Sequence, residues 1–520
     1  MKEDDLKEKK MARYKVVDRS PRFLPIVLDA QLMAGSFEYA LDYLIDHEID
    51  LSGIAKRYVN DETGAPAYDP AVMLKIVLLA YSRGVVSSRA IERLCRENVL
   101  FMAISGDSAP QFTTIAKFVR ELDEEVSAIF TQVLLICDRQ GLIGRQMFAI
   151  DGMKLPSNAD KRRSGTRAEL AHEAERMEGA VAKMLEAHRS RDESKDAGEA
   201  DDKDTARIER LQTEAKHIRG FLATHAERRS EKGAVRKSNV TDNDSAKMAT
   251  SKGVIQGYTA VAAVDGQAQI IVAARTHGSG SEQSVLVPMV EKTAALRTDQ
   301  TIITADAGYH SEANLEELYE RAVPALIADG LMRRRDARFA EQGRYKALPD
   351  PLYDKAAVGK PASVTFQPSD FVYAPSARSC ICPAGKKLYS TGSACSTHGR
   401  KHHKFQGAKR DCVPCHLREQ CLRYPQRTQT RQVAFFDKHQ ASPLRYTERM
   451  KRAIDTARGR ALYGRRIAIV EPVFANLRHN KRLDRFTLRT QPKVNTQWHL
   501  YCLVHNIEKL AHHGYGITRQ

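Results

Sequence analysis

Two apolar runs that each end on an aspartate restrict the possible folds of this chain more than any other feature of its sequence. The first lies in "QMFAIDGMKL" and ends at Asp151, and the second lies in "TIITADAGYHS" and ends at Asp306. A short continuous apolar run between polar residues is typical of a buried strand. The sequence therefore predicts two buried strands, each with a carboxylate at its C-terminal end.

The segments around these runs supply the other elements of the same sheet. "GVIQGYTAVAAV" and "AQIIVAARTHG" predict two strands joined by a hairpin at residues 265–266. A helix in "SEQSVLVPMVEKTAAL" precedes the strand of Asp306, and the helix "EANLEELYERAV" and the strand "PALIAD" follow it. The order β-β-β-α-β-α-β is that of a ribonuclease-H-like sheet, in which the two strands ending in aspartates are neighbours. A helix from about Tyr463, carrying Glu471, would complete this α/β fold.

The length of 520 residues is too great for a single hydrophobic core, so several domains are expected. We predict a ribonuclease-H-like core that is preceded by an all-helical domain and interrupted by two insertions. The boundaries are 1–140 for an N-terminal, helix-turn-helix-like DNA-binding domain, 145–164 and 236–330 for the first part of the core, 165–235 for a charged helical hairpin, 331–450 for a cysteine-rich, zinc-binding insertion, and 451–520 for the C-terminal part of the core.

The N-terminal domain is predicted to be helical over residues 70–135. Asp69 and Pro70 have the types favoured at the N-cap and the first position of a helix. Two further helical segments follow after short turns, and one of them carries "SRAIERLCR". Short helices joined in this way are typical of a helix-turn-helix module. A helical bundle without DNA contacts remains the alternative.

The first insertion contains two runs of apolar residues at heptad spacing, separated by "DESKDAGEADDKD". Such seams predict an antiparallel helical hairpin, and a solvated, partly disordered arm is the alternative. The first seam is Leu170, Ala174, Met177, Val181 and Met184, and the second is Ile208, Leu211, Ala215, Ile218 and Leu222.

The second insertion holds six of the nine cysteines of the chain, between residues 380 and 421, and His398, His402 and His403 lie among them. Paired soft ligands a few residues apart, in a reducing compartment, suit tetrahedral zinc. The best four ligands are Cys380, Cys382, Cys412 and Cys415; Cys421 is a credible replacement, and Cys395 is a weaker one. Zinc would act as a structural staple, because the insertion has few apolar residues with which to build a core. A set of unliganded thiols is the alternative.

The charge of the chain favours a polyanionic partner. It contains 82 Lys and Arg against 65 Asp and Glu, a net charge of +17, and nucleic acid is the commonest polyanion. A solvated basic surface is the alternative. The sequence contains no apolar run of about eighteen residues, and its first residues lack the apolar core of a secretory signal. We therefore expect a cytoplasmic protein, associated with the nucleoid.

The carboxylates of Asp151, Asp306 and Glu471 could together form one metal-binding site. Two strand-end carboxylates and one from a helix packed across the edge of the sheet would converge at one point. Hard carboxylate oxygens bind Mg²⁺ or Mn²⁺, and two such ions can hold the attacking and leaving oxygens of a phosphodiester displacement. Glu471 lies in a basic tract, with eleven Lys or Arg against three acids in residues 451–490. An ion-pair role for Glu471 is therefore the alternative.

With these motifs the chain resembles the DDE transposases of bacterial insertion sequences, in particular insertion-sequence family 1182. The resemblance covers nearly the whole chain and rests on "AIDGMKLPSNA", "TADAGYHSE", "IVEPVFANLR", the cysteine-rich insertion and the C-terminal "RFTLRT" and "WHLYCLVHNIEKL". It implies that Asp151, Asp306 and Glu471 hold two catalytic divalent metal ions. It also implies cleavage of DNA at the ends of the element and transfer of the 3′-hydroxyls to target DNA.

The surroundings of Glu471 suggest residues that contact DNA. Related transposases show the spacing Y-x₂-R-x₃-E-x₆-K, and here the gap between Arg466 and Glu471 is one residue longer, while Arg478 replaces the lysine. Seven residues are two helical turns, so Arg478 is expected on the face of Glu471. The candidate DNA-binding residues are Tyr463, Arg466, Arg478, Lys481 and Arg482.

Partners would be the terminal repeats and target DNA, bound by a homodimer or larger assembly. A nuclease without strand transfer and a non-catalytic regulator derived from a transposase are the rival functions.

Overall fold

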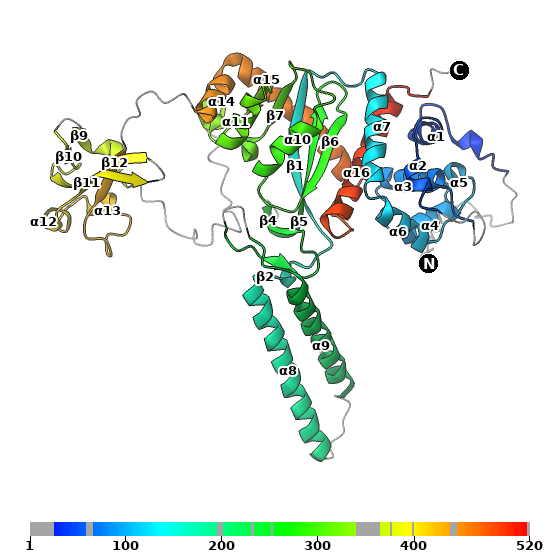
Figure 1. The fold of residues 1–520 in the computed structure, drawn as a ribbon, viewed down its shortest axis with the longest axis horizontal. Helices are drawn as coiled ribbons and strands as arrows, with labels where there is room; N and C mark the ends of the chain where they lie inside the picture. Colours follow the sequence, from blue (N-terminus) through cyan, green and yellow to red (C-terminus); the bar gives the residue numbers. More distant parts are fainter. Residues whose placement is uncertain are drawn as a thin grey trace, which may run out of the picture. The chain divides into compact units, whose positions relative to one another are not determined.

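The computed structural model describes residues 25–58, 66–194, 201–229, 233–250, 253–339, 365–374, 377–397, 400–436 and 445–516. The chain divides into two compact units (Figure 1). Unit 1 contains the described parts of residues 1–137, 480–482 and 500–520. Unit 2 contains those of residues 138–479 and 483–499. None of the helices in these segments combines the length and the apolarity that crossing a membrane requires.

Unit 1 is a bundle of short helices around α3. Asp69 caps α3, since its Oδ1 accepts a hydrogen bond of 2.8 Å from the backbone N–H of Ala71, as predicted. Lys75 on α3 is only 6% exposed, and its Nζ lies 2.8 Å from Asp42 and 2.9 Å from Asp46, because a buried charge requires partners. The helices are α1 (Phe37–His47), α2 (Ser52–Ala55), α3 (Pro70–Ser82), α4 (Ser88–Glu97), α5 (Val99–Ser105), α6 (Phe112–Glu121) and α7 (Glu125–Arg139).

The main sheet of unit 2 has the predicted strand order. Its path is β4-β5-β1-β7-β8, and β6 also pairs with β5. β1 is parallel to β7 and antiparallel to β5, so the two strands that carry the aspartates are neighbours, as predicted. β4 was not predicted. The strands are β1 (Met147–Pro156), β4 (Ala246–Thr250), β5 (Gly253–Asp265), β6 (Ile271–His277), β7 (Ile302–Ala305) and β8 (Ala325–Ile327).

β1 is longer than its apolar run predicted. Its parallel pairing with β7 ends at Ile150 and Ala305, but its antiparallel pairing with β5 continues to Pro156. The prediction that the strand ends at Asp151 was therefore wrong, because β5 supplies hydrogen bonds where β7 has stopped. Asp151 lies inside a strand, at the position where its parallel neighbour ends.

Five helices of unit 2 accompany the main sheet: α10 (Leu286–Lys292), α11 (Glu312–Glu320), α14 (Tyr446–Asp455), α15 (Ala457–Ala475) and α16 (Gln491–His512). α15 begins before the predicted start at Tyr463, and α10 is shorter than its predicted segment. The fully buried Trp498 on α16 donates a hydrogen bond of 3.1 Å from Nε1 to the carbonyl oxygen of Val261 on β5. Residues 500–512 of α16 group with unit 1, whereas the sequence-based boundary had placed all of 451–520 in the core.

The first insertion is the predicted helical hairpin, formed by α8 (Arg167–Ser194) and α9 (Asp201–Thr224), which run side by side (Figure 1). Its seam buries Leu170, Ala174 and Val181 against residues of α9. Of the predicted break, residues 195–200 lie outside the described segments. The residues of α9 that are buried in the seam are Ile208, Ala215, Ile218, Phe221 and Leu222.

The second insertion contains a five-stranded sheet of order β13-β12-β11-β10-β9. A small buried cluster is formed by Phe371, Cys380, Leu388, Phe405 and Val433. The expectation that this insertion would lack a core of its own was therefore wrong, because its few apolar residues gather on the strands. The elements are β9 (Val372–Ala374), β10 (Ser379–Ile381), β11 (Lys387–Thr397), β12 (Arg400–Gln406), α12 (Lys409–Cys412), α13 (Arg418–Cys421) and β13 (Gln432–Phe436).

Candidate active site

Asp151 and Asp306 lie at the same edge of the main sheet. Each follows the last residue of the parallel pairing between β1 and β7, in which Ile150 is opposite Ala305. The backbone N–H of Gly152 donates to Asp151 Oδ1 at 2.8 Å, and the N–H of Gly308 donates to Asp306 Oδ1 at 2.9 Å. Burial raises the pKa of Asp306 above its usual value, and the negative charge of Asp151 raises it further. The two carboxylates are thus oriented by backbone amides and close enough to repel each other.

α15 brings Arg466 and Tyr463 to these carboxylates. Arg466 Nη1 lies 2.8 Å from Asp151 Oδ2, and the Arg466 guanidinium lies 5.8 Å from the centroid of the Tyr463 ring. Arg466 Nε is buried and has no hydrogen-bond partner within the described segments. Burial raises the pKa of Tyr463, so its hydroxyl stays protonated. Arg466 is therefore a counterion of Asp151, and both side chains belong to the site.

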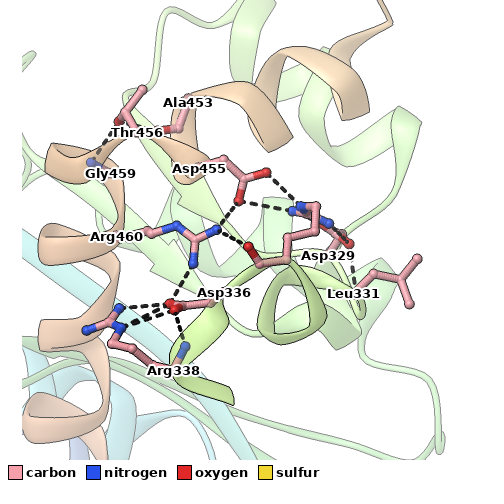
Figure 2. A network of polar contacts seen from close by, with 10 residues as sticks. Asp329, Leu331, Asp336, Arg338, Ala453, Asp455, Thr456, Gly459 and Arg460 are labelled. Carbon is pink, nitrogen blue, oxygen red and sulfur yellow. Dashed lines mark hydrogen bonds and ion pairs between the residues drawn. The ribbon is translucent and has the colours of Figure 1, made fainter. Parts of the chain in front are cut away.

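The start of α15 is held by a network of ion pairs shown in Figure 2. Arg460 on α15 lies 2.6 Å from Asp336 and 2.9 Å from Asp455, and Arg335 links Asp455 to Asp329 with distances of 2.6 Å to each. Arg335 lowers the pKa of Asp329 to about 2. The network connects the segment after β8 with the junction of α14 and α15, and so fixes the helix that presents Arg466.

Two further contacts shape the same helix. A Cβ on Gly459 would collide with the carbonyl oxygen of Ala453, so only glycine permits this close junction between α14 and α15. Pro472 has no backbone N–H, which leaves the carbonyl of Ala468 free of its usual helical partner. Gln269 Nε2 donates to that carbonyl at 3.1 Å, and this bond ties α15 to the turn between β5 and β6.

Glu471 is exposed on α15, and no hydrogen bond or ion pair joins it to a described residue. The extra residue between Arg466 and Glu471 explains this position, because five residues rotate the side chain by about 140° around a helix, whereas four rotate it by about 40°. The position four residues after Arg466 is held by Val470, which is fully buried. The structure therefore brings Asp151, Asp306 and Arg466 together and leaves the Glu471 carboxylate in solvent.

The sequence-based placement of Arg478 relative to Glu471 was wrong. α15 ends at Ala475, and Asn476–Asn480 forms a turn of π-helix, so the two residues are not two turns apart on one α-helix. Arg478 is half-buried and Arg482 is exposed. Lys481 is only 6% exposed, and its Nζ lies 2.5 Å from Glu508 Oε1, so its charge is already paired within unit 1.

Glu282, just before α10, is a site residue that sequence reasoning missed. The position that a Cβ would take on Gly308 lies 3.0 Å from Asp306 Oδ1 and 3.1 Å from Glu282 Oε2. The corresponding position on Gly152 lies 3.3 Å from Glu282 Oε1. Burial raises the pKa of Glu282 to about 7, with a further contribution from Asp306. An acid near the start of a helix is common, so only its place after the third strand of the sheet could have indicated this role.

The ligand types at this site suit a divalent cation, although the side chains are not at metal-binding distances. Asp151, Asp306 and Glu282 offer hard oxygen ligands, and the two glycines leave space between them. The fully buried Tyr309 hydroxyl has no hydrogen-bond partner within the described segments. Burial raises its pKa, and the three carboxylates raise it further. As the side chains stand, no three acidic, cysteine or histidine residues in the described segments have the arrangement of a metal site. Asp151 Oδ2 is occupied by Arg466 instead.

The cysteines of the second insertion lie around its apolar cluster, against which Cys382 and Cys421 pack. Cys380 is fully buried in the apolar cluster, where it contacts no solvent. Cys382, Cys412, Cys415 and Cys421 line one cavity. The side chain of Cys395 lies outside the residues whose environment is described. The structure thus groups Cys421, and not Cys380, with the other three predicted ligands.

Three family models match parts of the chain. Two are described as a transposase DDE domain and match residues 210–371 and 381–511, and a third, described as a transposase domain (DUF772), matches residues 26–121. The chain contains transposase domains of the DDE type. Glu282, Asp306 and Glu471 lie in the matched segments, whereas Asp151 lies outside all three, so its assignment depends on the pairing of β1 with β7. No curated protein and no solved structure matches the chain.

Proposed function

We propose that the chain is the DNA transposase of a bacterial insertion sequence of the type of family 1182. It would cleave DNA at the ends of its element and transfer the 3′-hydroxyls to target DNA. The observation that supports this function is the position of Asp151 and Asp306 on adjacent parallel strands, with Arg466 of α15 beside them. The transposase domain matches, two of which include Asp306 and Arg466, support the same function.

The carboxylates would hold Mg²⁺ or Mn²⁺, which would polarise the scissile phosphate and activate the attacking oxygen. The residues of the chain prepare this site in other ways. The N–H groups of Gly152 and Gly308 orient the two aspartates, and Arg466 offsets the charge of Asp151 until a cation or DNA arrives. Arg466 then becomes available to a phosphate group, since it is a bidentate donor that phosphate oxygens also satisfy.

The third carboxylate of the site has two candidates. Glu471 is the residue that the resemblance implies, and its exposed side chain would have to turn toward the aspartates when DNA binds. Glu282 already lies beside Asp306. We propose that Glu282 belongs to the site, together with Glu471 or in its place.

Glutamine substitutions separate these candidates, because they keep the size of the side chain and remove its charge. We expect E282Q to weaken both cleavage and Mn²⁺ binding, as measured by calorimetry, with E316Q on the exposed face of α11 as the matched control. If E282Q resembles the wild type while E471Q is inactive, Glu282 has no role and the acids are Asp151, Asp306 and Glu471. If E471Q is active, Glu471 is a surface residue.

DNA binding would involve both units. α4 carries exposed arginines at positions 89, 93 and 96, on the side away from the buried Ile91 and Cys95. In unit 2 we propose DNA contacts for Tyr463, Arg466 and Arg478, and in unit 1 for Arg482. Lys481 would contribute only if its pair with Glu508 opened. Double-stranded DNA of the terminal repeats and the target would be the partner, and joining two ends requires at least a dimer.

The decisive experiment uses DNA ends that are already cut. A transposase joins their 3′-hydroxyls to a second duplex in the presence of Mg²⁺, and D306N abolishes both cleavage and joining. Hydrolysis without joining would favour the ribonuclease-H-like nuclease. DNA binding with neither reaction in the wild-type protein would favour a non-catalytic regulator. Inverted repeats in the DNA flanking the gene would supply the natural substrate for this assay.

A further inference from the structure

The strongest unassigned feature of the molecule is the cavity lined by four thiols in the second insertion. Cys382 follows β10, Cys412 ends α12, Cys415 lies three residues later and Cys421 ends α13. All four line the same cavity, which has an otherwise largely apolar wall that includes Leu388, Leu417 and Leu422.

The turn at Cys382 has the shape of a metal-binding loop. The backbone N–H of Gly385 donates to the carbonyl oxygen of Cys382 at 2.8 Å, and the N–H of Cys382 donates to that of Lys386 at 2.9 Å. Gly385 has a φ of +74°, which favours glycine. The N–H of Lys386 points at Cys382 Sγ at 3.4 Å. A backbone N–H directed at sulfur stabilises a thiolate, because it supplies a partial positive charge.

Two arginines surround the four sulfurs. Arg418 donates to the carbonyl oxygen of Cys412 at 2.8 Å, and also to those of Pro425 and Thr428, which closes the loop between α13 and β13. Arg431 donates to the carbonyl oxygens of Cys421 at 3.1 Å and Phe366 at 2.7 Å. Both arginines line the cavity. Four thiolates around Zn²⁺ carry a net charge of about −2, and two guanidinium groups would balance it.

We propose that Cys382, Cys412, Cys415 and Cys421 bind a structural zinc ion, with Arg418 and Arg431 as its charge-balancing neighbours. Four protein ligands leave no open position for water or substrate, so the ion holds the fold and performs no chemistry. Its formation draws the four sulfurs closer than they stand here, where their spacing is not that of a bound site. Cys380 is left out of this ligand set because it is fully buried and does not line the cavity that the other four cysteines share.

Metal analysis of single-cysteine variants tests this ligand set. The full chain purified under reducing conditions should contain about one zinc per molecule. C421S should lose most of that zinc, and C380S is the matched control that should keep it, since both change one sulfur to oxygen in the same insertion. Zinc-free wild-type protein would overturn the proposal. Zinc retained by C421S and lost by C380S would also overturn it.

A second measurement covers the case in which a variant fails to fold. Wild-type protein in which Co²⁺ replaces zinc should show the intense sulfur-to-metal absorption of a tetrahedral site with four thiolates. The same protein should protect its four ligand thiols from alkylation until a chelator is added, with the protected cysteines identified by mass spectrometry. Weak, octahedral cobalt absorption, or free alkylation of Cys421 in the metal-loaded protein, would refute the site without any substitution.

Discussion

The carboxylates at the edge of the main sheet and the thiols of the second insertion are both clusters of like groups, yet they are built in opposite ways. Asp151, Glu282 and Asp306 come from three elements that are distant in sequence, and only the order of the strands brings them together. The thiols come from the turn after β10 and from α12, α13 and the segment between these two helices. The first cluster is a product of topology, and the second is mainly a product of local geometry.

The two clusters also differ in how their charge is balanced. At the sheet edge an arginine contacts a carboxylate directly, with 2.8 Å between Arg466 and Asp151, and so occupies a position that a metal ion would need. In the insertion the arginines donate to backbone carbonyls around the thiols and leave the sulfurs free to converge. A catalytic metal must exchange its ligands with substrate, whereas a structural metal must be enclosed. The difference in arrangement is that expected if the first cluster has the catalytic role and the second the structural role proposed for them.

The largest effect is expected from D306N, which disrupts the carboxylate cluster. D306N keeps the size of the side chain and its hydrogen bond from Gly308, and it removes a metal ligand. Loss of metal stabilisation of several kcal/mol corresponds to a decrease of about a thousandfold or more in the rate of cleavage. Gel-based cleavage assays at saturating DNA measure this rate. DNA affinity should remain, so loss of both affinity and activity would indicate misfolding and not a catalytic role.

Removal of zinc should affect the other cluster alone. A chelator is expected to make residues 365–436 sensitive to protease, because structural zinc contributes folding free energy directly. The main sheet and the hairpin of α8 and α9 should keep their resistance, as followed by mass spectrometry of the fragments. Proteolysis that starts in the main sheet, or no change anywhere, would contradict the division between the two clusters.

The stability of the protein should depend on pH through Glu282 in the carboxylate cluster. The pKa of Glu282 is raised to about 7 in the folded protein, so its contribution to folding is present at low pH and is lost as the pH rises through about 7. Without divalent ions we expect the melting temperature to fall between about pH 4.5 and pH 7, and Mg²⁺ to oppose this fall. E282Q should show a smaller fall. Identical pH profiles for E282Q and the wild type would remove Glu282 from the cluster.

The smallest effect concerns the basic residues around the carboxylates. R478A should weaken DNA binding about equally for all sequences and lower the slope of affinity against salt by about one, because it removes one phosphate contact. K481A should not change that slope, since Lys481 is paired with Glu508. Fluorescence anisotropy at several salt concentrations measures both variants. Equal changes in the two slopes would show that the pair with Glu508 opens on DNA.

Much of the fold followed from the sequence. The apolar runs before Asp151 and Asp306 predicted two buried strands, and the order of elements between them predicted that these strands are neighbours. The heptad spacing predicted the seam of the hairpin, including Leu170 and Ala174. These features depend on periodicity and element order, which report burial and topology without knowledge of the contacts.

The identity of contacting side chains was decided only by the tertiary structure. Glu282 lies beside Asp306 because the segment between β6 and α10 lies at the edge of the sheet. Lys481 can be buried because Glu508 pairs with its charge. Cys380 and Cys382 look equivalent in the sequence, but Cys380 on β10 is fully buried within the apolar cluster. Cys382, just after β10, packs against that cluster and also lines the cavity of the other thiols. A sequence pattern records the environment that a residue prefers, whereas its partner depends on distant segments that must first be folded against it.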